Sequence, residues 1–354
     1  MKFFSTSIVI LILLSSSFIG LSYDVKKISI SKSYNGNILY VGGNGTGNYT
    51  KIQDAIDNAS DGDTVFVFDD LSPYYCNIEI AFRKINLIGE NKNTTVIDSN
   101  GKGNTINAFT KQVNIRGFSI RNSGGESGDA GFYHEEGYND IISNNIITSN
   151  QVGIFLYCSD SCNITKNIIT NNKYGIIGGG HERVGECWNN NISINIMSRN
   201  SQFGIYLLLL FHNGITSNNT IINNRVGIGN GYNYGSDDDN ILVRNNISCN
   251  LIGLLTFNSN AIITQNNFMK NIRHAQCRSP FFEIPKEPIW NENYWGKARN
   301  YPYPIPTKTG FIFFLWPGFP QFDMNPAKEP YNIPEGNNII VERNCHEGFD
   351  AYVK

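Results

Sequence analysis

The feature that most constrains this chain is a short motif that recurs from Asn139 onward at intervals in the twenties of residues. Each copy has an initial Asn, a run of mainly β-branched residues, a second Asn five positions later and then a Gly. Repeats of this length indicate a solenoid, in which every copy adds one unit to the previous one. Complete copies start at Asn145, Asn167, Asn195, Asn219 and Asn245, and a copy at Asn266 lacks the Gly.

The pattern inside each copy is typical of β-strands. Apolar residues alternate over three to five positions and are then interrupted by a turn residue, and a further short apolar segment precedes each copy. The sequence therefore predicts an all-β, right-handed, single-stranded parallel β-helix with a core of stacked Ile and Val. We expect the repeated Asn residues to tolerate left-handed turn geometry and to bond to their equivalents in the next coil. Both the repeated Asn and the repeated Gly are interpreted as structural.

The N-terminal part of the repeat region has the features of a cap. Residues 37–42 and 64–68 read as strands, and Thr50 with Gln53 forms a capping-box pattern before an apolar helix face that runs from Ile52 to Ala59. A solenoid would otherwise expose the core and the strand edge of its first coil. We therefore predict an amphipathic capping helix.

The two ends of the chain differ from the repeats. Residues 1–22 read as a Sec-type signal peptide, and the alternative is an uncleaved anchor helix. Residues 37–290 form the predicted β-helix with its N-terminal cap, and 291–354 a Pro- and aromatic-rich C-terminal cap. The seven Cys residues suit an oxidising compartment, but no pairing is assigned, and no Cys/His spacing indicates zinc.

Several segments carry a family resemblance. The run YTKIQDAIDNASDGDTVFVF, followed by INLIGENKNTTVID and VNIRGFSIRNS, resembles the opening of pectin-lyase-like β-helix proteins. The Asn/Gly/Ile repeats are similar to those of NosD-type proteins, and NYWG at 293–296 resembles a coil-closing segment of NosD-like and related archaeal surface proteins. This resemblance implies an extracellular, cell-surface or periplasmic protein that binds or cleaves carbohydrate, or a NosD-type copper-site accessory protein.

The enzyme signatures of these relatives are missing. Gly180-His181 precedes the Asp237–Asp239 run and no RIK follows, so the order of polygalacturonase motifs fails. The arginine pair of pectate lyases and the GxxDFIFG-type segment of pectin methylesterases are absent as well. Copper handling would favour clusters of Met, His and Cys, whereas the 4 Met and 5 His residues are scattered along the sequence.

Three longer polar segments carry the candidate functional residues: 124–140, 178–188 and 229–240. The last two occupy the same phase of the coil, so we expect them to leave the same edge of the solenoid, roughly 10 Å apart. Carboxylates and aromatic rings together suit sugar binding, and paired carboxylates suit acid/base cleavage. The ligand-binding candidates are His134, Glu135, Glu136, Glu186, Trp188, Tyr232 and Tyr234. The catalytic candidates are His181, Glu182, Asp237, Asp238 and Asp239, of which the three Asp could also bind Ca²⁺.

The leading hypothesis is an exported, non-catalytic protein that binds or displays polysaccharide or surface glycan. The alternatives are a polysaccharide lyase or glycoside hydrolase, and the copper accessory role. A net charge of −2 gives no electrostatic reason to expect nucleic acid as partner. Membrane association is expected only through an uncleaved N-terminal segment. The apolar run Leu207–Phe211 is expected to fill the core or a lateral groove.

Overall fold

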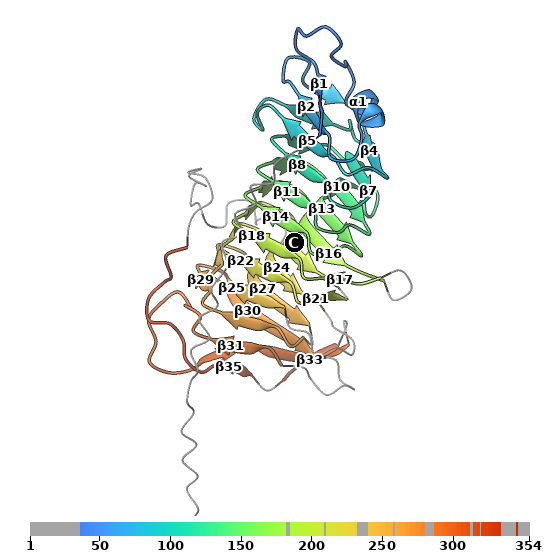
Figure 1. Ribbon diagram of the computed structural model, residues 1–354. Helices are drawn as coiled ribbons and strands as arrows, with labels where there is room; N and C mark the ends of the chain where they lie inside the picture. Colours follow the sequence, from blue (N-terminus) through green and yellow to red (C-terminus); the bar gives the residue numbers. More distant parts are fainter. Residues whose placement is uncertain are drawn as a thin grey trace, which may run out of the picture. The chain divides into compact units, whose positions relative to one another are not determined.

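The structure is a computed structural model, which describes residues 36–181, 185–208, 210–231, 240–257, 259–279, 287–311, 314–318, 320–333 and Cys345. The predicted signal peptide lies outside these residues. Among them the chain winds through three parallel sheets in turn, so that each coil adds one strand to each sheet (Figure 1). The predicted parallel β-helix is confirmed.

The three sheets are called A, B and C. Sheet A consists of β1 (Ile38–Val41), β2 (Thr64–Val67), β5 (Asn86–Gly89), β8 (Asn114–Arg116), β11 (Ile141–Ser143), β14 (Asn163–Thr165), β18 (Asn191–Ser193), β22 (Ile215–Ser217), β25 (Ile241–Val243), β28 (Ile262–Thr264) and β31 (Ile289–Asn291). Sheet B consists of β3 (Tyr74–Tyr75), β6 (Val96–Asp98), β9 (Ser119–Arg121), β12 (Ile146–Thr148), β15 (Ile168–Thr170), β19 (Ile196–Ser198), β23 (Thr220–Ile222), β26 (Asn246–Ser248) and β29 (Asn267–Met269).

Sheet C consists of β4 (Ile78–Ala81), β7 (Ile106–Phe109), β10 (Ala130–Glu135), β13 (Val152–Tyr157), β16 (Tyr174–Gly179), β20 (Phe203–Leu207), β24 (Val226–Asn230), β27 (Ile252–Phe257), β30 (Arg273–Ser279), β33 (Thr307–Phe311) and the antiparallel β34 (Phe314–Pro317). Two small pairs lie outside these sheets: β17 (Cys187–Trp188) with β21 (Phe211–His212), and β32 (Tyr303–Ile305) with β35 (Gln321–Asp323). Among the described residues there is no helix long and apolar enough to cross a membrane.

The core consists of columns of side chains that stack from coil to coil. The strand register places Ile142, Ile164 and Ile192 above one another in sheet A, and all three are fully buried. In β11 and β14 the chain neighbours of these Ile residues are only half-buried, as the two-residue period of a strand requires. The predicted burial of the run at Leu207–Phe211 is confirmed for Leu207, Leu210 and Phe211.

Two ladders of buried Asn side chains hold the corners on either side of sheet B. In each rung the Oδ1 atom accepts the backbone N–H and the Nδ2–H of the Asn one coil earlier, as Asn219 does from Asn195 at 2.9 and 3.2 Å. The Nδ2 atom also donates to a strand carbonyl of the preceding coil, which is the carbonyl of Ile192 for Asn219. One ladder contains Asn145, Asn167, Asn195, Asn219, Asn245, Asn266 and Asn293, and the other Asn150, Asn172, Asn200, Asn224, Asn250 and Asn271.

The predicted bonding between equivalent Asn residues is thus confirmed, but the predicted turn geometry was assigned to the wrong residue. The left-handed backbone belongs to the residue before each ladder Asn, such as Lys166, Ile194 or Arg244, with φ of 60°, 58° and 53°. This residue turns the chain so that the following Asn side chain points inward. The amide, with its paired donor and acceptor, is therefore what the ladder position requires.

The repeated Gly residues allow neighbouring coils to approach. A Cβ atom on Gly175 would lie 2.3 Å from the carbonyl oxygen of Gly204 and 3.1 Å from Nδ2 of Asn200. Equivalent contacts surround Gly153, Gly204, Gly227 and Gly253. Every other residue type would therefore separate the coils at this corner.

The N-terminal end has the predicted helix without the predicted capping box. Helix α1 (Ile52–Asn58) buries Ile52, Ala55 and Ile56, but no side chain caps its first turn. Gln53 instead bonds through Oε1 and Nε2 to the backbone N–H and carbonyl of Glu79 in β4. Since both polar ends of Gln53 are used by the strand, the helix is fixed by contact with sheet C.

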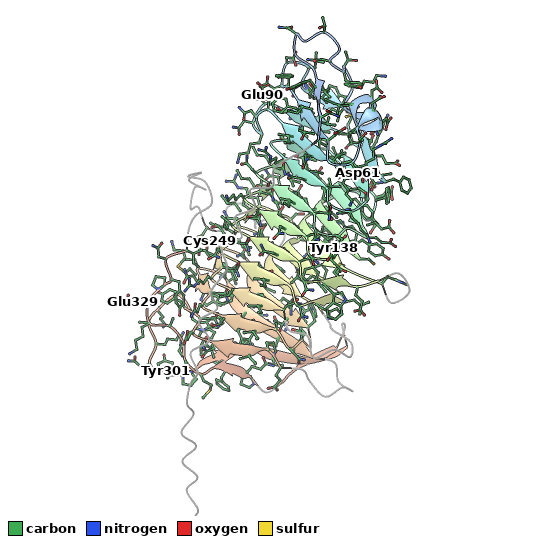
Figure 2. All side chains as sticks on the ribbon, in the orientation of Figure 1. Asp61, Glu90, Tyr138, Cys249, Tyr301 and Glu329 are labelled. Atoms are coloured by element: carbon green, nitrogen blue, oxygen red, sulfur yellow. A yellow bond between two sulfur atoms is a disulfide. The ribbon has the colours of Figure 1, made fainter. Side chains whose placement is uncertain are left out.

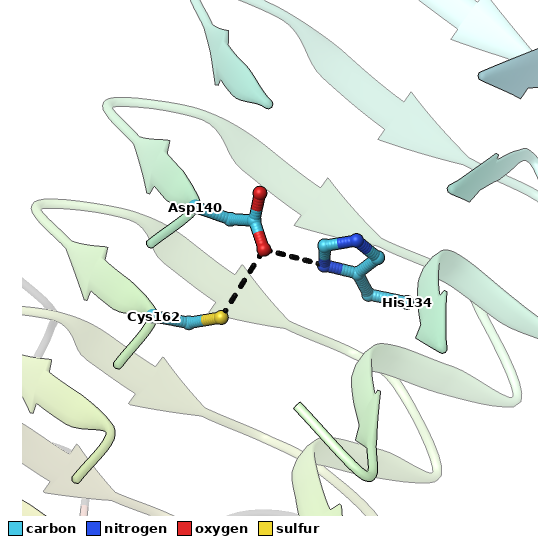
Figure 3. Close-up of side chains that lie close together, drawn as sticks. All are labelled: His134, Asp140 and Cys162. Atoms are coloured by element: carbon cyan, nitrogen blue, oxygen red, sulfur yellow. Dashed lines mark hydrogen bonds and ion pairs between the residues drawn. The ribbon is translucent and has the colours of Figure 1, made fainter. Parts of the chain in front are cut away.

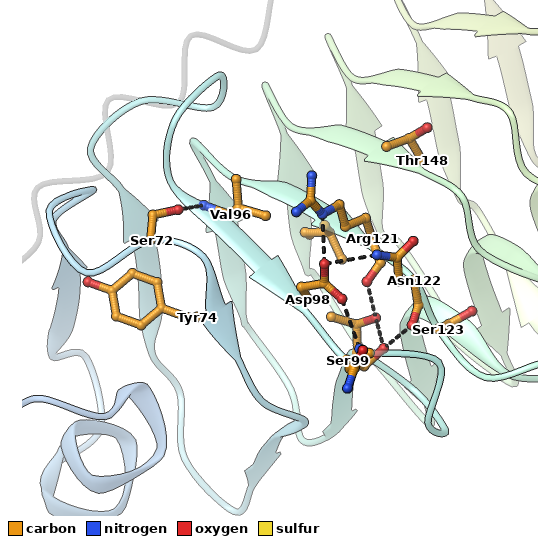
Figure 4. A network of polar contacts seen from close by, with 12 residues as sticks. Ser72, Tyr74, Val96, Asp98, Ser99, Arg121, Asn122, Ser123 and Thr148 are labelled. Carbon is orange, nitrogen blue, oxygen red and sulfur yellow. Dashed lines mark hydrogen bonds and ion pairs between the residues drawn. The ribbon is translucent and has the colours of Figure 1, made fainter.

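A charged network replaces the Asn ladder in the coils before Ser123 (Figure 4). Asp98 accepts hydrogen bonds from Nε of Arg121 and Nδ2 of Asn122, both at 2.8 Å, and from the backbone N–H of Asn100. Ser99 donates to the carbonyl of Asn122. The principle is the same as in the ladder, because a side chain of one coil satisfies polar groups of the next.

The ladder leads to a first prediction. Asn219→Ala removes the acceptor for two N–H groups of Asn195 and leaves them buried, so we expect the free energy of unfolding to fall by about 2–4 kcal/mol. Urea unfolding followed by circular dichroism measures it. Asn300→Ala, at an exposed position, is the control and should change stability by less than about 0.5 kcal/mol. Equal losses for both variants would show that the ladder amides add nothing specific.

A second prediction concerns His274, which lies against Trp295 and Tyr303. Burial, together with the charge of Arg299, lowers the pKa of His274 to about 4. The unfolded chain takes up this proton near pH 6.5 and the folded chain only near pH 4. Stability should therefore fall by up to about 3 kcal/mol as the pH drops through this window and then level off. His274→Gln should lack this component when unfolding is measured at pH 7.5, 5.5 and 4.

Candidate functional site

Three fully buried polar side chains meet inside the coils, at the corner between sheets C and A (Figure 3). His134 comes from β10, Asp140 from the residue before β11, and Cys162 from the residue before β14. The Oδ2 atom of Asp140 lies 3.2 Å from Nδ1 of His134 and 3.3 Å from Sγ of Cys162. All three donor atoms lie within 4.8 Å of one another. We call these residues the buried triad.

The register of the coils explains why these side chains meet. His134 lies in an inward-facing column of sheet C, between Ala108 and Leu156. Asp140 and Cys162 occupy consecutive rungs of a third corner ladder, one position before the sheet A strands. Further along, Asn190 and Asn240 fill this position and accept the backbone N–H groups of Cys162 and Gly214. Oδ1 of Asp140 likewise accepts the backbone N–H of Val113 at 2.7 Å.

The imidazole of His134 has a defined orientation. Its Nε2 atom lies 2.8 Å from the carbonyl oxygen of Thr110, which can only accept, so Nε2 carries the proton and donates it. In the neutral ring the lone pair therefore lies on Nδ1. Among the described residues Nδ1 makes no hydrogen bond, although Asp140 is close.

Burial dominates the electrostatics of the triad. It raises the pKa of the Asp140 carboxyl, opposed by the nearby His134 and by the N–H of Val113. It also raises the pKa of the Cys162 thiol well above its usual value, with a further contribution from Asp140. Without a cation the thiol is therefore protonated and donates to Oδ2 of Asp140.

The backbone of Gly137 lies against one side of the triad. A Cβ atom at this position would lie 2.4 Å from Nδ1 of His134 and 2.6 Å from Oδ2 of Asp140. The backbone N–H of Gly137 donates to Oγ of Ser159, which fixes its distance from the next coil. Because Gly137 has no side chain, its backbone can lie against these two donor atoms.

Several predicted site residues lie outside the triad at the same corner. The ring of Trp188 packs against that of His212 at a centroid distance of 4.5 Å and a tilt of 32°, and Oε2 of Glu186 lies 3.6 Å from Nε2 of His212. The N–H of Trp188 donates to Asp160, whose pKa is raised by burial and further by Glu186. Glu136 follows β10 with φ of 53° and is exposed, as is Tyr138 two residues later (Figure 2).

The outer side of sheet C carries a second group of functional interest. On β10, β13, β16 and β20 the side chains that alternate with the buried ones are mostly aromatic. Tyr174, Phe203 and Tyr206 form a parallel stack with interplanar angles of 10–15°. Gly229 leaves room for Phe203 and Tyr206. We define the aromatic face by Phe109, Tyr133, Phe155, Tyr157, Tyr174, Phe203 and Tyr206, all of them half-buried or exposed.

The structure locates some of the predicted site residues and not others. Segments 178–188 and 229–240 both start at the end of a sheet C strand and return to sheet A, as their shared phase predicts. His181 is exposed, with its backbone bridged to Gly185, and Glu135 lies beside Tyr133. The candidates Glu182, Tyr232, Tyr234, Asp237, Asp238 and Asp239, and with them the proposed Ca²⁺ ligands, lie outside the described residues.

Segment 124–140 differs from the prediction. Part of this polar segment is a regular strand of sheet C, β10, which pairs with β7 and β13. His134 is consequently directed inward and is fully buried, so it is separated from any ligand at the surface. The alternation of Phe132 and His134 with Tyr133 is the pattern of a strand and would have predicted that His134 points inward. The segment was nevertheless interpreted as a surface segment because it is highly polar.

Asp140 and Cys162 were not among the predicted site residues. Their distance in the sequence resembles no metal motif, because the separation of 22 residues is one turn of the coil. The available signal was the ladder position itself, where Asp140 and Cys162 stand in place of the Asn found at 190 and 240.

One family profile matches most of the chain. It is described as "Periplasmic copper-binding protein (NosD)" and matches residues 56–299. A curated relative, the saccharopine dehydrogenase [NADP(+), L-glutamate-forming] of Pyricularia oryzae, is 36% identical over 64 residues. That match spans 17% of this chain and only 14% of the dehydrogenase, so it carries no activity over.

Solved structures show the same fold at low sequence identity. The Dettilon tailspike protein has a TM-score of 0.50 at 15% identity, over 73% of this chain and 61% of the tailspike. The alginate lyase from Paenibacillus sp. str. FPU-7 has a TM-score of 0.50 at 13% identity, over 69% of this chain and 93% of the lyase. Likeness at this level supports the right-handed parallel β-helix and nothing about activity.

A third prediction tests the packing of the corner. Gly137→Ala places a methyl group against His134 and Asp140, so we expect a loss of about 1–3 kcal/mol of unfolding free energy. Gly125→Ala is the control, because its Cβ atom would meet nothing within 4 Å. Chemical denaturation of both variants gives the comparison. Equal stability of Gly137→Ala and the wild type would contradict the described arrangement of the triad.

Proposed function

We propose that this chain, which belongs to the NosD family, is an exported protein that binds polysaccharide on the aromatic face of sheet C. The observation that carries the proposal is the row of aromatic rings from β7 to β20. Sugar rings have apolar faces, which pack on Tyr and Phe, while phenol hydroxyls and carboxylates bond to sugar hydroxyls.

The dimensions of the aromatic face suit a chain-like ligand. It crosses the five strands β7, β10, β13, β16 and β20, which corresponds to about 19 Å at the usual strand spacing. Phe109, Tyr133 and Phe155 follow one another edge to face. In the register of the strands Ile177 separates Phe155 from Tyr206, which stacks with Tyr174 and Phe203. A repeating ligand can therefore lie across the coils and contact both groups of rings.

Polar groups border the aromatic face. Tyr133 bonds to Glu135, and Nζ of Lys173 lies 5.7 Å from the centroid of the Tyr174 ring. Arg225 bonds to Gln202 one coil earlier. Carboxylate, amide and cationic groups beside flat apolar rings offer the mixed contacts that fix the orientation of a sugar.

Export is supported by the chemistry of the chain. The N-terminal sequence has the charge and apolar run of a secretory signal. Cys249 pairs with Cys345 across 96 residues of sequence, and disulfides persist in oxidising compartments. Both features favour a periplasmic, cell-surface or extracellular protein.

Cleavage of the bound polysaccharide is a second candidate function. Burial and the nearby Glu186 raise the pKa of Asp160, and His212 and Trp188 lie beside these two residues at the corner next to sheet C. Acid/base cleavage of a glycosidic bond uses two neighbouring carboxyl groups, of which the general acid has a raised pKa.

A fourth prediction tests binding. Tyr174→Ala combined with Tyr206→Ala should weaken binding to a polysaccharide selected on a glycan array by at least about 10-fold, because stacked aromatic anchors dominate such contacts. Tyr301→Ala is the control, an exposed Tyr in the segment after the coils (Figure 2). Unchanged affinity in a double variant that still unfolds cooperatively would refute the aromatic face as the binding site. Release of unsaturated or reducing ends from the same ligand would show cleavage.

A further inference from the structure

We propose that the buried triad of His134, Asp140 and Cys162 is a binding site for one divalent transition-metal ion, with Zn²⁺ as the ion that best fits its donors. The inference is independent of glycan binding, since the triad lies inside the coils and the aromatic face outside them. It rests on donor chemistry, on geometry and on the way the triad departs from the ladders around it.

The donor set selects the class of ion. One imidazole nitrogen, one carboxylate oxygen and one sulfur are ligands that Zn²⁺ accepts together. Mg²⁺ and Ca²⁺ prefer a shell of oxygen atoms and would not use the sulfur. The chemistry of the site therefore favours a borderline cation.

The distances already resemble those of a coordination shell. Zn²⁺ at about 2.0–2.3 Å from each ligand in a tetrahedron sets neighbouring ligand atoms roughly 3.3–3.6 Å apart. Asp140 lies 3.2 Å from His134 and 3.3 Å from Cys162, and no pair of donor atoms exceeds 4.8 Å. Only small movements of the side chains would be needed to surround an ion.

The imidazole is prepared for this role. Metal-binding His residues usually donate their second ring N–H to a carbonyl or carboxylate, which directs the lone pair of the other nitrogen at the ion. The Thr110 carbonyl fulfils this function for Nε2 of His134. The remaining nitrogen, Nδ1, is buried, makes no hydrogen bond among the described residues, and faces the other two donors.

Two residues of the triad, Asp140 and Cys162, are ionisable, whereas equivalent positions in later coils hold the neutral amide of Asn. At the same corner, Asn190 and Asn240 satisfy the backbone without any charge. Asp140 also satisfies the backbone, through Oδ1, and this leaves Oδ2 directed at His134 and Cys162. A buried carboxylate and thiolate are costly unless a cation balances them. A divalent ion supplies that balance.

Full burial defines how the ion would act. With all three side chains closed from solvent, the ion would be taken up as the coils form, so that its binding energy adds to folding. It would join residues 134, 140 and 162 of two successive coils. The site is therefore structural in character.

The test uses the full chain, refolded with a small excess of Zn²⁺ and then freed of loose metal by gel filtration. Elemental mass spectrometry should find about one zinc ion per chain. A chelator present during unfolding should lower the unfolding midpoint. Co²⁺ in place of Zn²⁺ should give a sulfur-to-cobalt charge-transfer band. The variants are Asp140→Asn and Cys162→Asn, which introduce the residue that the ladder uses elsewhere, and His134→Leu, which matches the next residue in its column, Leu156.

We expect each of these variants to fold, to lose at least about nine-tenths of the zinc and, for Cys162→Asn, to lose the cobalt band. Cys277→Ser, at a buried thiol in β30, should keep both signals. Absence of zinc from the refolded wild type, or equal zinc in the wild type and the two Asn variants, would overturn the site. Retention of copper in preference to zinc would overturn the choice of ion. Glycan affinity should be the same in all four variants, which separates this result from that of the proposed function.

Discussion

The structure depends on one constraint, which is that every backbone N–H buried at a corner between sheets needs an acceptor. Within a sheet the neighbouring strand supplies it, but at a corner the chain turns and the strand pairing is interrupted. Here the next coil provides the acceptor through a side chain. Oδ1 of Asn219 for Asn195, Oδ1 of Asn190 for Cys162 and Oγ of Ser159 for Gly137 all follow this rule. Since each rung needs the coil beyond it, the coils stabilise one another.

The same constraint produces the buried triad. A corner position requires an acceptor, but Asn, Asp, Ser and Cys can all provide one. Exchanging Asn for Asp140 therefore keeps the backbone satisfied and adds an oxygen directed into the core. In this way the scaffold can hold reactive groups inside without losing its corner bonds. The residue that faces this oxygen is His134, which belongs to an inward-facing column of sheet C.

The inward face of sheet C forms the core, and its outward face carries the aromatic side chains. The inward side chains of β13, Ile154 and Leu156, are fully buried, whereas the outward Phe155 and Tyr157 belong to the aromatic face. A shift of one residue in register would exchange the two sets. The close contacts at Gly153 and Gly175 help to prevent it, because only Gly fits where neighbouring backbones approach. These close contacts thus also maintain the surface on which glycan binding is proposed.

The sequence by itself determined the fold, because the features that specify it are periodic. Alternating Ile, an Asn five residues after another and a following Gly are local patterns, and the helix at Ile52–Asn58 and the strand at Thr64–Val67 were readable in the same way. It also indicated the corner where the long segments leave the coils. It did not indicate that Thr50 leaves the helix uncapped, that the left-handed turn precedes the ladder Asn, or that His134 points inward. These depend on which residues of different coils lie opposite one another. Asp140 and Cys162 are separated by the length of one coil. This length differs from one repeat to the next, because the loops differ in length. Only the tertiary structure, which fixes the register, could bring His134, Asp140 and Cys162 together.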